Sequence, residues 1–568
     1  MNVMQSQTMK QEVWLNLYSK KVNETLQIFE KNNFVNRLWS KDTSLWKKNA
    51  DHQKQIAGAL GWMGVLDWIE PRITEMLDFS EEIKKAGFKD VVLLGMGGSS
   101  LASEVFRLSL PSKKGYPKLH VLDSTDPHWV FSIEKAVEKI SKTLFLVSSK
   151  SGTTTEPLAF YHYFFDKTKQ NGSQFVAITD PGSYLESVAK EKKFRKIFLN
   201  PSDIGGRFSA LSYFGLVPAA LSGKDVQGLF HSARKMMQAC KNSSVADNPG
   251  VQLGVILGEL SKIGRNKMTL IFPKAVESLG LWIEQLVAES SGKEGKGIIP
   301  IAGEPGSSLT RYGNDRVFIT LHVGKKKDAK IQKLFSSLKK KQHPVIELQM
   351  NKPEDLGAEL FRWEIATAAA CSVLNINAFD QPDVQAAKDL TKVILKKLES
   401  TGSLPQLETH LQEKQFQITL SQATHSHPQS TLRDFFNHMK PGDYFGILAF
   451  LPFDSKVDQE LNQLRVLLRD LTGSATLFGY GPRYLHSTGQ LHKGGDNNGV
   501  FIVLSAATQK DMPIPNQPFS FAQLESAQAL GDFQALDRQG RRAIFVKLKL
   551  PLTSSLKSLA QLIKKSIK

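Results

Sequence analysis

The stretch Ser148–Thr155 concentrates side chains that could bind an anion. Its residues are mostly hydroxylated, with one Lys and one Gly among them. The apolar run Leu144–Val147 precedes it and Glu156-Pro157 follows, which predicts a buried strand before the loop and a helix start after it. Backbone N–H groups, hydroxyls and the helix dipole would then face the anion. The stretch predicts a phosphate cradle without Walker A spacing, and an ordinary loop rich in helix caps is the alternative.

Gly95–Ser100 is a second candidate loop, directly after the apolar run Val91–Leu94. It partly fits a dinucleotide fingerprint, with Asp123 as the acid at the end of the next strand. The fit is incomplete because Ser100 stands where the third Gly is required. The other interpretation is that Gly97, Gly98 and Ser99 let the backbone approach a sugar closely.

Two further residues could take part in acid–base or oxyanion chemistry. Arg207 follows two glycines in Gly205–Ser209, so a permanent cation could come close to a ligand, although a structural Arg in a turn is also common. Gln285 and Glu289 are four residues apart on a predicted helix that ends at Gly292, and they share a face. Glu289 opposes the dipole of that helix. This is a hint of function, and a surface Glu is the alternative.

Alternating strand and helix patterns must position these loops. We expect a helical segment over 1–87, an α/β unit over 88–240, a second over 241–400, a linker over 401–440 and a third α/β unit over 441–568. In parallel sheets ligands bind at the carboxyl ends of the strands, where both candidate loops fall. In the first unit the predicted strands are Val91–Leu94, Leu119–Leu122, Leu144–Val147, Phe175–Ile178 and Lys196–Phe198.

The second and third units resemble one another. Ile283–Leu286 lies in a predicted helix before the strand around Phe318–Leu321, and Leu461–Leu464 lies in a helix before Phe501–Leu504. We interpret this as a divergent internal repeat. The third unit lacks the Glu of the second but carries His486 and His492.

The length, charge and cysteine content of the chain limit the class of protein. The 568 residues carry 73 basic and 55 acidic side chains, a net charge of +18, with Lys-rich runs at 325–341, 388–397 and 557–568. These runs lack interleaved aromatic residues, so we interpret them as solvated helix faces and predict no nucleic-acid partner. No apolar run is long enough for a membrane helix, and we see no signal peptide. The two cysteines have no metal-ligand spacing and fit a reducing cytoplasm.

Five motifs, in order, resemble the glucose-6-phosphate isomerase family. They are Gly97-Gly98-Ser99, Ser149–Thr154, Gly206-Arg207, Gln285-x3-Glu289-Ser-x-Gly-Lys293, and Asn377-x-Phe379-Asp380-Gln381 with Lys388. The segments Trp39–Trp46, Leu60–Trp62 and Arg483–Gln490 look most like the isomerase part of bifunctional transaldolase/phosphoglucose isomerase. Only about 90 residues precede the first sheet, too few for the transaldolase barrel. The resemblance implies tandem three-layer αβα sugar-isomerase domains with flavodoxin-like parallel sheets, N-terminal helices and a third C-terminal α/β unit.

The resemblance also implies roles for single residues. Ser149, Lys150, Ser151 and Thr154 would bind the substrate phosphate, and Gly98 and Ser99 would contact the sugar. Glu289, beside Gln285, would move a proton between C1 and C2 through a cis-enediol, and Arg207 would steady the enediolate oxygen. Lys388 and a His would open the ring. These roles suit the residue types, because a buried carboxylate and a His near neutral pKa can transfer protons without a metal or cofactor.

The chain differs from the family in the position of that His. Between Glu289 and Lys388 the chain has only His322 and His343, neither in a matching motif. His486 lies in a similar segment, but after Lys388, and His492 is its rival. In the common dimer this His comes from the partner subunit. We hypothesise that the third unit supplies it within the chain, so that the active enzyme could be a monomer. A homodimer is the alternative.

The implied activity is reversible isomerisation of glucose 6-phosphate and fructose 6-phosphate, a step of glycolysis and gluconeogenesis in the cytoplasm. One alternative is an isomerase that also accepts mannose 6-phosphate. Another is a non-catalytic sugar-phosphate sensor, which would need the phosphate loop but neither Glu289 nor Lys388.

Overall fold

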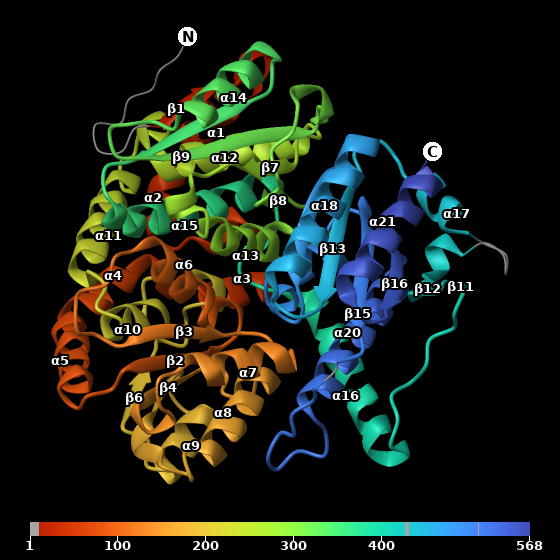
Figure 1. The fold of residues 1–568 in the computed structure, drawn as a ribbon. Helices are drawn as coiled ribbons and strands as arrows, with labels where there is room; N and C mark the ends of the chain where they lie inside the picture. The colour runs from red at the N-terminus through yellow and green to blue at the C-terminus, as the bar shows by residue number, and fades with distance from the viewer. Residues whose placement is uncertain (1–10, 426–430, 509, 568) are drawn as a thin grey trace.

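The computed structural model describes residues 11–425, 431–508 and 510–567. The described strands form three sheets, each covered by helices, as Figure 1 shows with the first in orange, the second in green and the third in blue. We call each sheet with its helices a unit. The predicted α/β class with parallel sheets is confirmed. Within the described ranges, no helix combines the length and apolarity needed to cross a membrane.

The first sheet is parallel throughout and has the strand order β3-β2-β4-β5-β6. Val91 and Leu93 pack on one face, against α5, α6 and α10, while Val92 and Leu94 pack on the other, against α7 and α8. The sheet is therefore the middle of three layers. Its strands are β2 (Asp90–Gly95), β3 (Lys118–Leu122), β4 (Thr143–Ser148), β5 (Phe175–Thr179) and β6 (Lys196–Leu199). Its helices are α6 (Leu101–Ser109), α7 (Pro127–Ala136), α8 (Thr155–Lys167), α9 (Tyr184–Glu191), α10 (Tyr213–Leu221) and α11 (Val226–Cys240).

The second sheet has the order β1-β10-β9-β7-β8, with β1 antiparallel to β10 and the other pairs parallel. The N-terminal segment was expected to be helical, and β1 (Gln11–Trp14) differs from that expectation because it completes this sheet at its edge. The other strands are β7 (Lys267–Leu270), β8 (Ile299–Ala302), β9 (Arg316–Val323) and β10 (Val345–Met350). The helices are α12 (Pro249–Lys262), α13 (Leu279–Ser291), α14 (Ala329–Lys340) and α15 (Leu356–Leu374).

The N-terminal helices connect the first two units. The Trp46 indole donates to the carbonyl of Ala368 at 2.8 Å, and the Trp62 ring stacks on Phe208, so both units bury tryptophans from this segment. The helices are α1 (Ser19–Lys31), α2 (Phe34–Trp39), α3 (Ala50–Ala57), α4 (Val65–Ile69) and α5 (Ile73–Lys85).

The third sheet has the order β11-β12-β16-β15-β13-β14. Segment 401–440 was expected to be a linker, but β11 (Leu411–Gln412), β12 (Phe416–Leu420) and α17 (Leu432–Asn437) lie within it, and β12 pairs with β16. The alternating apolar residues of β12 were the signal for this strand. The other strands are β13 (Tyr444–Phe450), β14 (Ala475–Tyr480), β15 (Gly499–Ala506) and β16 (Arg542–Leu548), and the other helices are α18 (Ser455–Thr472), α19 (Gly489–Gly494), α20 (Phe521–Arg538) and α21 (Leu552–Ile567).

The second and third sheets repeat one topology. Five strands of each sheet correspond, β8-β7-β9-β10-β1 to β14-β13-β15-β16-β12, and β1 and β12 each pair antiparallel with the strand before them in this order. The short strand β11 extends only the third sheet. This agreement supports the predicted internal repeat. Edge strands β8 and β14 lie close together, and Arg465 of α18 donates to the carbonyls of Ala302 and Gly303 across the junction.

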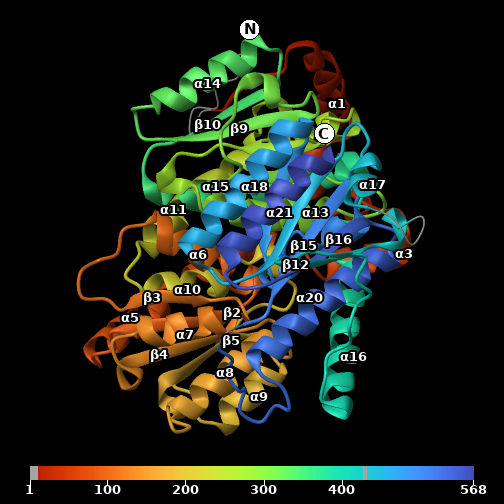
Figure 2. The same cartoon turned by 45° about the vertical axis from the view of Figure 1, so that its right-hand side comes forward.

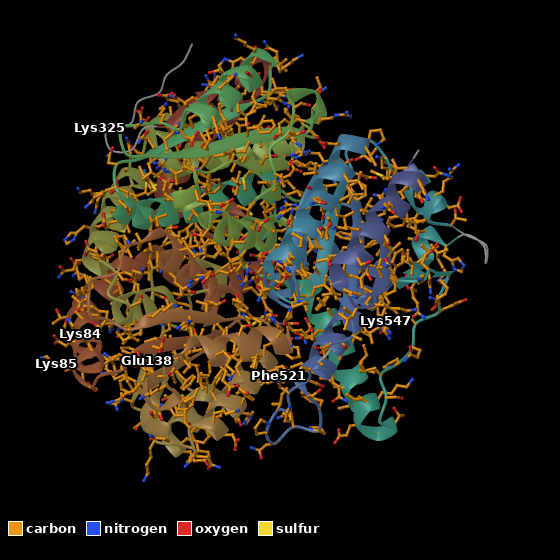
Figure 3. All side chains as sticks on the ribbon, in the orientation of Figure 1. Lys84, Lys85, Glu138, Lys325, Phe521 and Lys547 are labelled. Atoms are coloured by element: carbon orange, nitrogen blue, oxygen red, sulfur yellow. The ribbon has the colours of Figure 1, made fainter. Side chains whose placement is uncertain are left out.

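Helix α16 (Gln385–Thr401) leads from the second unit to the third and packs beside α20 (Figure 2). At the start of α20, Phe521 lies where the third unit meets the first (Figure 3), with its ring against Phe160 and Tyr163 of α8. The third unit is thus packed against both others. The exposed Lys325 in the first Lys-rich run projects into solvent, as predicted for a solvated face (Figure 3).

Candidate active site

Three short loops from two units meet at one point. The turn Gly97–Ser99 packs against both Gly206–Phe208 and Arg483–His486. A Cβ on Gly98 would lie 2.0 Å from the carbonyl oxygen of Gly206. Gly97 has φ of +55°, and a Cβ there would lie 2.7 Å from the carbonyl oxygen of His486. The glycines are therefore required for the close approach of these backbones, and Gly98 and Ser99 lie at the meeting point.

The hydroxyl loop between β4 and α8 is held by its own side chains. Ser149 Oγ accepts from the backbone N–H of Gly152 and bonds to Thr154 Oγ1, both at 3.2 Å. Ser151 Oγ accepts from the N–H of Thr153 at 3.3 Å. Ser151, Thr153, Thr154 and Thr155 line a cavity, whereas Ser149 lies behind them in the loop. The loop thus presents hydroxyl donors at the N-terminus of a 13-residue helix, as predicted.

Lys150 does not point into that cavity. Its ammonium forms an ion pair with Asp180 and donates to the carbonyl of Ser202 at 2.7 Å. The Asp180 side chain is 12% exposed, so the charge of Lys150 is compensated inside the protein. The Lys150 ammonium is therefore not positioned to contact a phosphate in the cavity, although the sequence led us to expect that contact.

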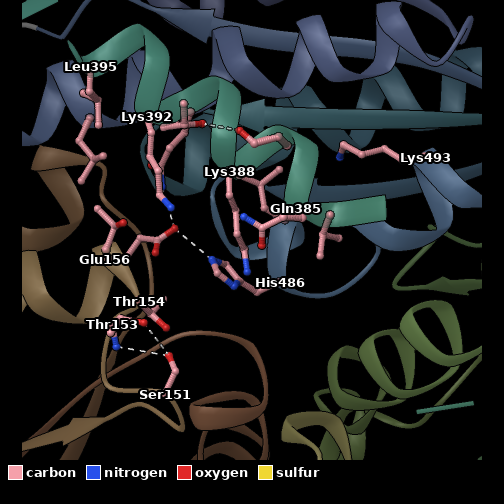
Figure 4. A pocket seen from close by; sticks show the side chains of 17 residues that line it. Ser151, Thr153, Thr154, Glu156, Gln385, Lys388, Lys392, Leu395, His486 and Lys493 are labelled. Atoms are coloured by element: carbon pink, nitrogen blue, oxygen red, sulfur yellow. Dashed lines mark hydrogen bonds and ion pairs between the residues drawn. The ribbon is translucent and has the colours of Figure 1, made fainter. Parts of the chain in front are cut away.

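The cavity has a volume of about 290 Å³ and lies between the hydroxyl loop, α16, α20 and the turn Arg483–His486. Figure 4 shows Lys388 from α16 and His486 from the third unit pointing into it, above Ser151, Thr153 and Thr154. The structure thus brings the predicted Lys and His together beside the predicted phosphate loop.

His486 is held by a buried carboxylate. Its Nε2 donates to Glu156 Oε1 at 3.0 Å, and Gln528 Nε2 donates to the same oxygen at 2.7 Å. Thr125 Oγ1 in turn donates to Gln528 Oε1 at 2.7 Å. Burial alone would raise the pKa of Glu156, but the charge and hydrogen bond of His486 outweigh it and lower that pKa. The buried carboxylate therefore pairs with His486 and fixes the orientation of its ring.

Sequence reasoning missed Glu156 and Gln528. Glu156 was interpreted only as an acid at a helix start, and its position directly after the hydroxyl loop was an available signal. The sequence carried no signal for Gln528, because this residue lies on α20, far along the chain from the hydroxyl loop, and belongs to no motif.

The other histidines considered for this role do not line the cavity. Both ring nitrogens of His492 lack a hydrogen-bond partner within the described residues, and the ring lies between Tyr484 and Phe501. Burial lowers the pKa of His492 well below its usual value. His322 bonds to Glu347 within the second sheet, and His343 is buried just before β10. The geometry therefore favours His486 over these three histidines as the residue that opens the sugar ring.

Glu289 lies at the end of α13, next to the cavity but outside its lining. Arg207 Nη1 is 3.2 Å from Glu289 Oε1, and Gln285 Nε2 donates to Glu289 Oε2 at 3.1 Å. The same Gln285 nitrogen donates to the carbonyl of His486 at 2.8 Å. Gln285 therefore ties the carboxylate to the turn that carries His486, and the Arg207 cation offsets the unfavourable helix dipole.

Arg207 is buried and fully occupied. Its Nε donates to Ser290 Oγ at 2.8 Å, Nη1 donates to Gln381 Oε1 at 2.9 Å, and Nη2 donates to two backbone carbonyls of loop 378–381 at 2.7 and 2.9 Å. These four hydrogen bonds and the ion pair with Glu289 surround the guanidinium. In this geometry Arg207 positions Glu289 and the loop, and a substrate oxygen would have to replace one of these partners.

A family model described as phosphoglucose isomerase matches residues 69–298. The chain is related to the glucose-6-phosphate isomerases. A probable glucose-6-phosphate isomerase of Methanococcus maripaludis is 28% identical over 378 residues, which are 60% of this chain and 84% of that protein. The glucose-6-phosphate isomerase of Methanocaldococcus jannaschii is 27% identical over 369 residues, 59% of this chain and 90% of that protein.

Solved structures of low sequence identity share the fold. A hypothetical protein from Thermus thermophilus has a TM-score of 0.56 and 22% identity, and the match covers 68% of this chain and 99% of that protein. A glucose-6-phosphate isomerase from Chlamydia trachomatis has a TM-score of 0.53 and 19% identity, and the match covers 69% of this chain and 89% of that protein.

The family match contains only part of the site. Residues 69–298 include the hydroxyl loop, Arg207 and Glu289, whereas Lys388 and His486 lie beyond them. The described residues contain no group of three or more His, Cys, Asp or Glu side chains arranged to hold a metal ion.

Proposed function

We propose that this chain catalyses the reversible isomerisation of glucose 6-phosphate and fructose 6-phosphate. The observation that carries the proposal is the convergence of three groups from three parts of the chain. Lys388 and His486 enter one cavity beside the hydroxyl loop, and Glu289 is tied to the turn of His486 by Gln285. An aldose–ketose exchange needs such a set: an anion anchor, a proton donor for the ring oxygen and a carboxylate base.

The substrate phosphate binds at the hydroxyl loop, where hydroxyl donors and the N-terminus of α8 meet it. His486, oriented by Glu156, donates a proton to the ring oxygen, and Lys388 stands beside the ring. As the C1–O5 bond breaks, the C1 hydroxyl loses its proton to solvent, and this frees the C1 carbonyl of the aldose. Glu289 then removes the proton from C2, a proton reaches the C1 oxygen, and the cis-enediol forms. Return of the proton from Glu289 to C1, with loss of the proton on the C2 oxygen, yields the ketose.

All these groups belong to one chain, and this supports a site that is complete without a partner subunit. Sedimentation analysis tests the idea: activity that persists where only monomer sediments supports it, and an obligate dimer contradicts it.

The two cysteines, Cys240 and Cys371, are buried and unpaired, which fits a protein of the reducing cytoplasm.

The decisive experiment is a coupled isomerase assay on Glu289→Gln. We expect kcat to fall by about 10²–10⁴-fold, the contribution of a positioned base. Glu284→Gln is the matched control, because Glu284 lies on the same helix and burial raises its pKa to about 8, so it carries a proton at neutral pH. Equal activity of Glu289→Gln and the wild type would exclude the proposed mechanism.

A further inference from the structure

One face of α16 forms a wall of the cavity. Gln385, Lys388, Thr391, Lys392 and Leu395 recur at helical spacing and all line it. Lys388 and Lys392 extend from the helix toward the side that carries Glu156 and His486 (Figure 4). The Lys392 side chain is 67% exposed, and its ion pair with Asp389 is long, at 3.9 Å. Such a pair contributes little, so the ammonium of Lys392 can turn to a ligand at small cost.

The opposite wall lacks a cation for a phosphate dianion. The hydroxyls of Ser151, Thr153 and Thr154 are neutral donors, and Lys150 is held by Asp180 and by the carbonyl of Ser202. The carboxylate of Glu156 in the first turn of α8 adds a negative charge beside the anchor. Lys388 and His486 serve ring opening in the proposed mechanism. Lys493 also lines the cavity, but it is buried in an ion pair with Asp532. Charge balance at the anchor therefore calls for another cation on the cavity wall.

We infer that Lys392 is a substrate-binding residue that pairs with the phosphate of the sugar phosphate. The inference rests on the proposed function for the identity of the substrate. Lys392 lies one helical turn beyond Lys388, so one helix face presents a cation for the ring and a second for the phosphate. Its exposure places it at the solvent side of the cavity, where it also attracts the dianion from solution. The pairing selects phosphorylated over free sugars.

The test compares Lys392→Ala, Lys392→Arg and Lys396→Ala. Lys396 is the matched control, because it is exposed on the next turn of α16 but does not line the cavity. Loss of a charge-assisted contact predicts that Lys392→Ala raises KM about 5- to 30-fold with kcat unchanged. Lys392→Arg restores most of the affinity, Lys396→Ala matches the wild type, and the salt dependence of kcat/KM weakens only in Lys392→Ala.

A second measurement separates this inference from the proposed function. Binding of inorganic phosphate is measured by calorimetry on the same proteins, without turnover. Weaker phosphate binding in Lys392→Ala supports the inference, even if the wild type shows no isomerase activity and the proposed function fails. Unchanged phosphate affinity together with unchanged KM overturns the inference, and so does a fall in kcat at constant KM.

Discussion

The Glu156–His486 pair offers the sharpest test of the acid that opens the sugar ring. Glu156→Gln keeps the size of the side chain and removes its charge. In the wild type, Glu156 Oε1 accepts hydrogen bonds from His486 at 3.0 Å and from Gln528 at 2.7 Å. The amide has no charge to pair with His486, so it holds the ring less firmly in the orientation from which His486 donates a proton to the ring oxygen.

The expected loss follows from the burial of this pair. The Glu156 side chain is 6% exposed and that of His486 is 15% exposed, so solvent screens their interaction little. Hydrogen bonds to charged groups contribute about 1.5–3 kcal/mol. Since about 1.4 kcal/mol corresponds to a factor of ten in rate, kcat/KM for the ring-closed substrate should fall about 10- to 100-fold.

The assay compares two substrates. One is ring-closed glucose 6-phosphate, and the other is an analogue whose 4- and 5-hydroxyls are both blocked, so that neither a furanose nor a pyranose ring can form and it stays open-chain. We expect Glu156→Gln to lose activity on the first and to keep most of it on the second. Glu134→Gln is the control, since Glu134 is a half-buried carboxylate of the same unit that bonds to Tyr163 at 2.6 Å, remote from the cavity. Equal losses on both substrates, or no loss on either, would refute the assigned role.

Three other predictions test the surroundings of the site. Arg207→Lys should lower kcat about 100-fold, measured in the coupled assay, because an ammonium cannot replace the fork of hydrogen bonds; wild-type kcat would contradict this. His486→Ala should lose about 10²-fold in kcat, whereas His492→Phe should keep wild-type kinetics, and the reverse result would make His492 the acid. Hydrogen bonding to His322, opposed by burial and aided by Lys339, lowers the pKa of Glu347 to about 2. Because the folded-state pKa is depressed, this stabilisation, at most about 3 kcal/mol, is present above pH 4.5 and is lost as the pH falls toward 2. The difference in Tm between the wild type and Glu347→Gln should therefore become smaller as the pH falls over that range. A difference that stays constant would show that the ionised Glu347 does not stabilise the fold in this way.

Much of the core could be predicted from the sequence because its signals are local. Leu144–Val147 is a short apolar run, and a strand buried on both faces requires such a run. The loop after it carries its own hydroxyl and Gly signals, and Gly292 ends α13 as predicted. Lys388 and His486 were chosen from motifs, and the structure places them in one cavity.

The remaining features depend on contacts between segments distant in the chain. The direction of Lys150 is set by Asp180, which lies 30 residues away at the end of the neighbouring strand. The role of Glu156 requires His486 from another unit, 330 residues on. β1 is a short strand of four residues whose stability comes from pairing with β10 rather than from its own pattern. A single sequence carries no local signal for these tertiary contacts.

The strand order of the third sheet has a consequence for the timing of activity during synthesis. β16 lies between β12 and β15, so this sheet cannot close before residue 548 has been made. By residue 400 the ribosome has made every strand of the first two sheets and the hydroxyl loop. At about 5–20 residues per second, the wall with His486 and Gln528 is complete on the order of ten seconds later. A nascent chain therefore acquires its anion anchor before its ring-opening acid, and isomerisation begins only after residue 548 has been made.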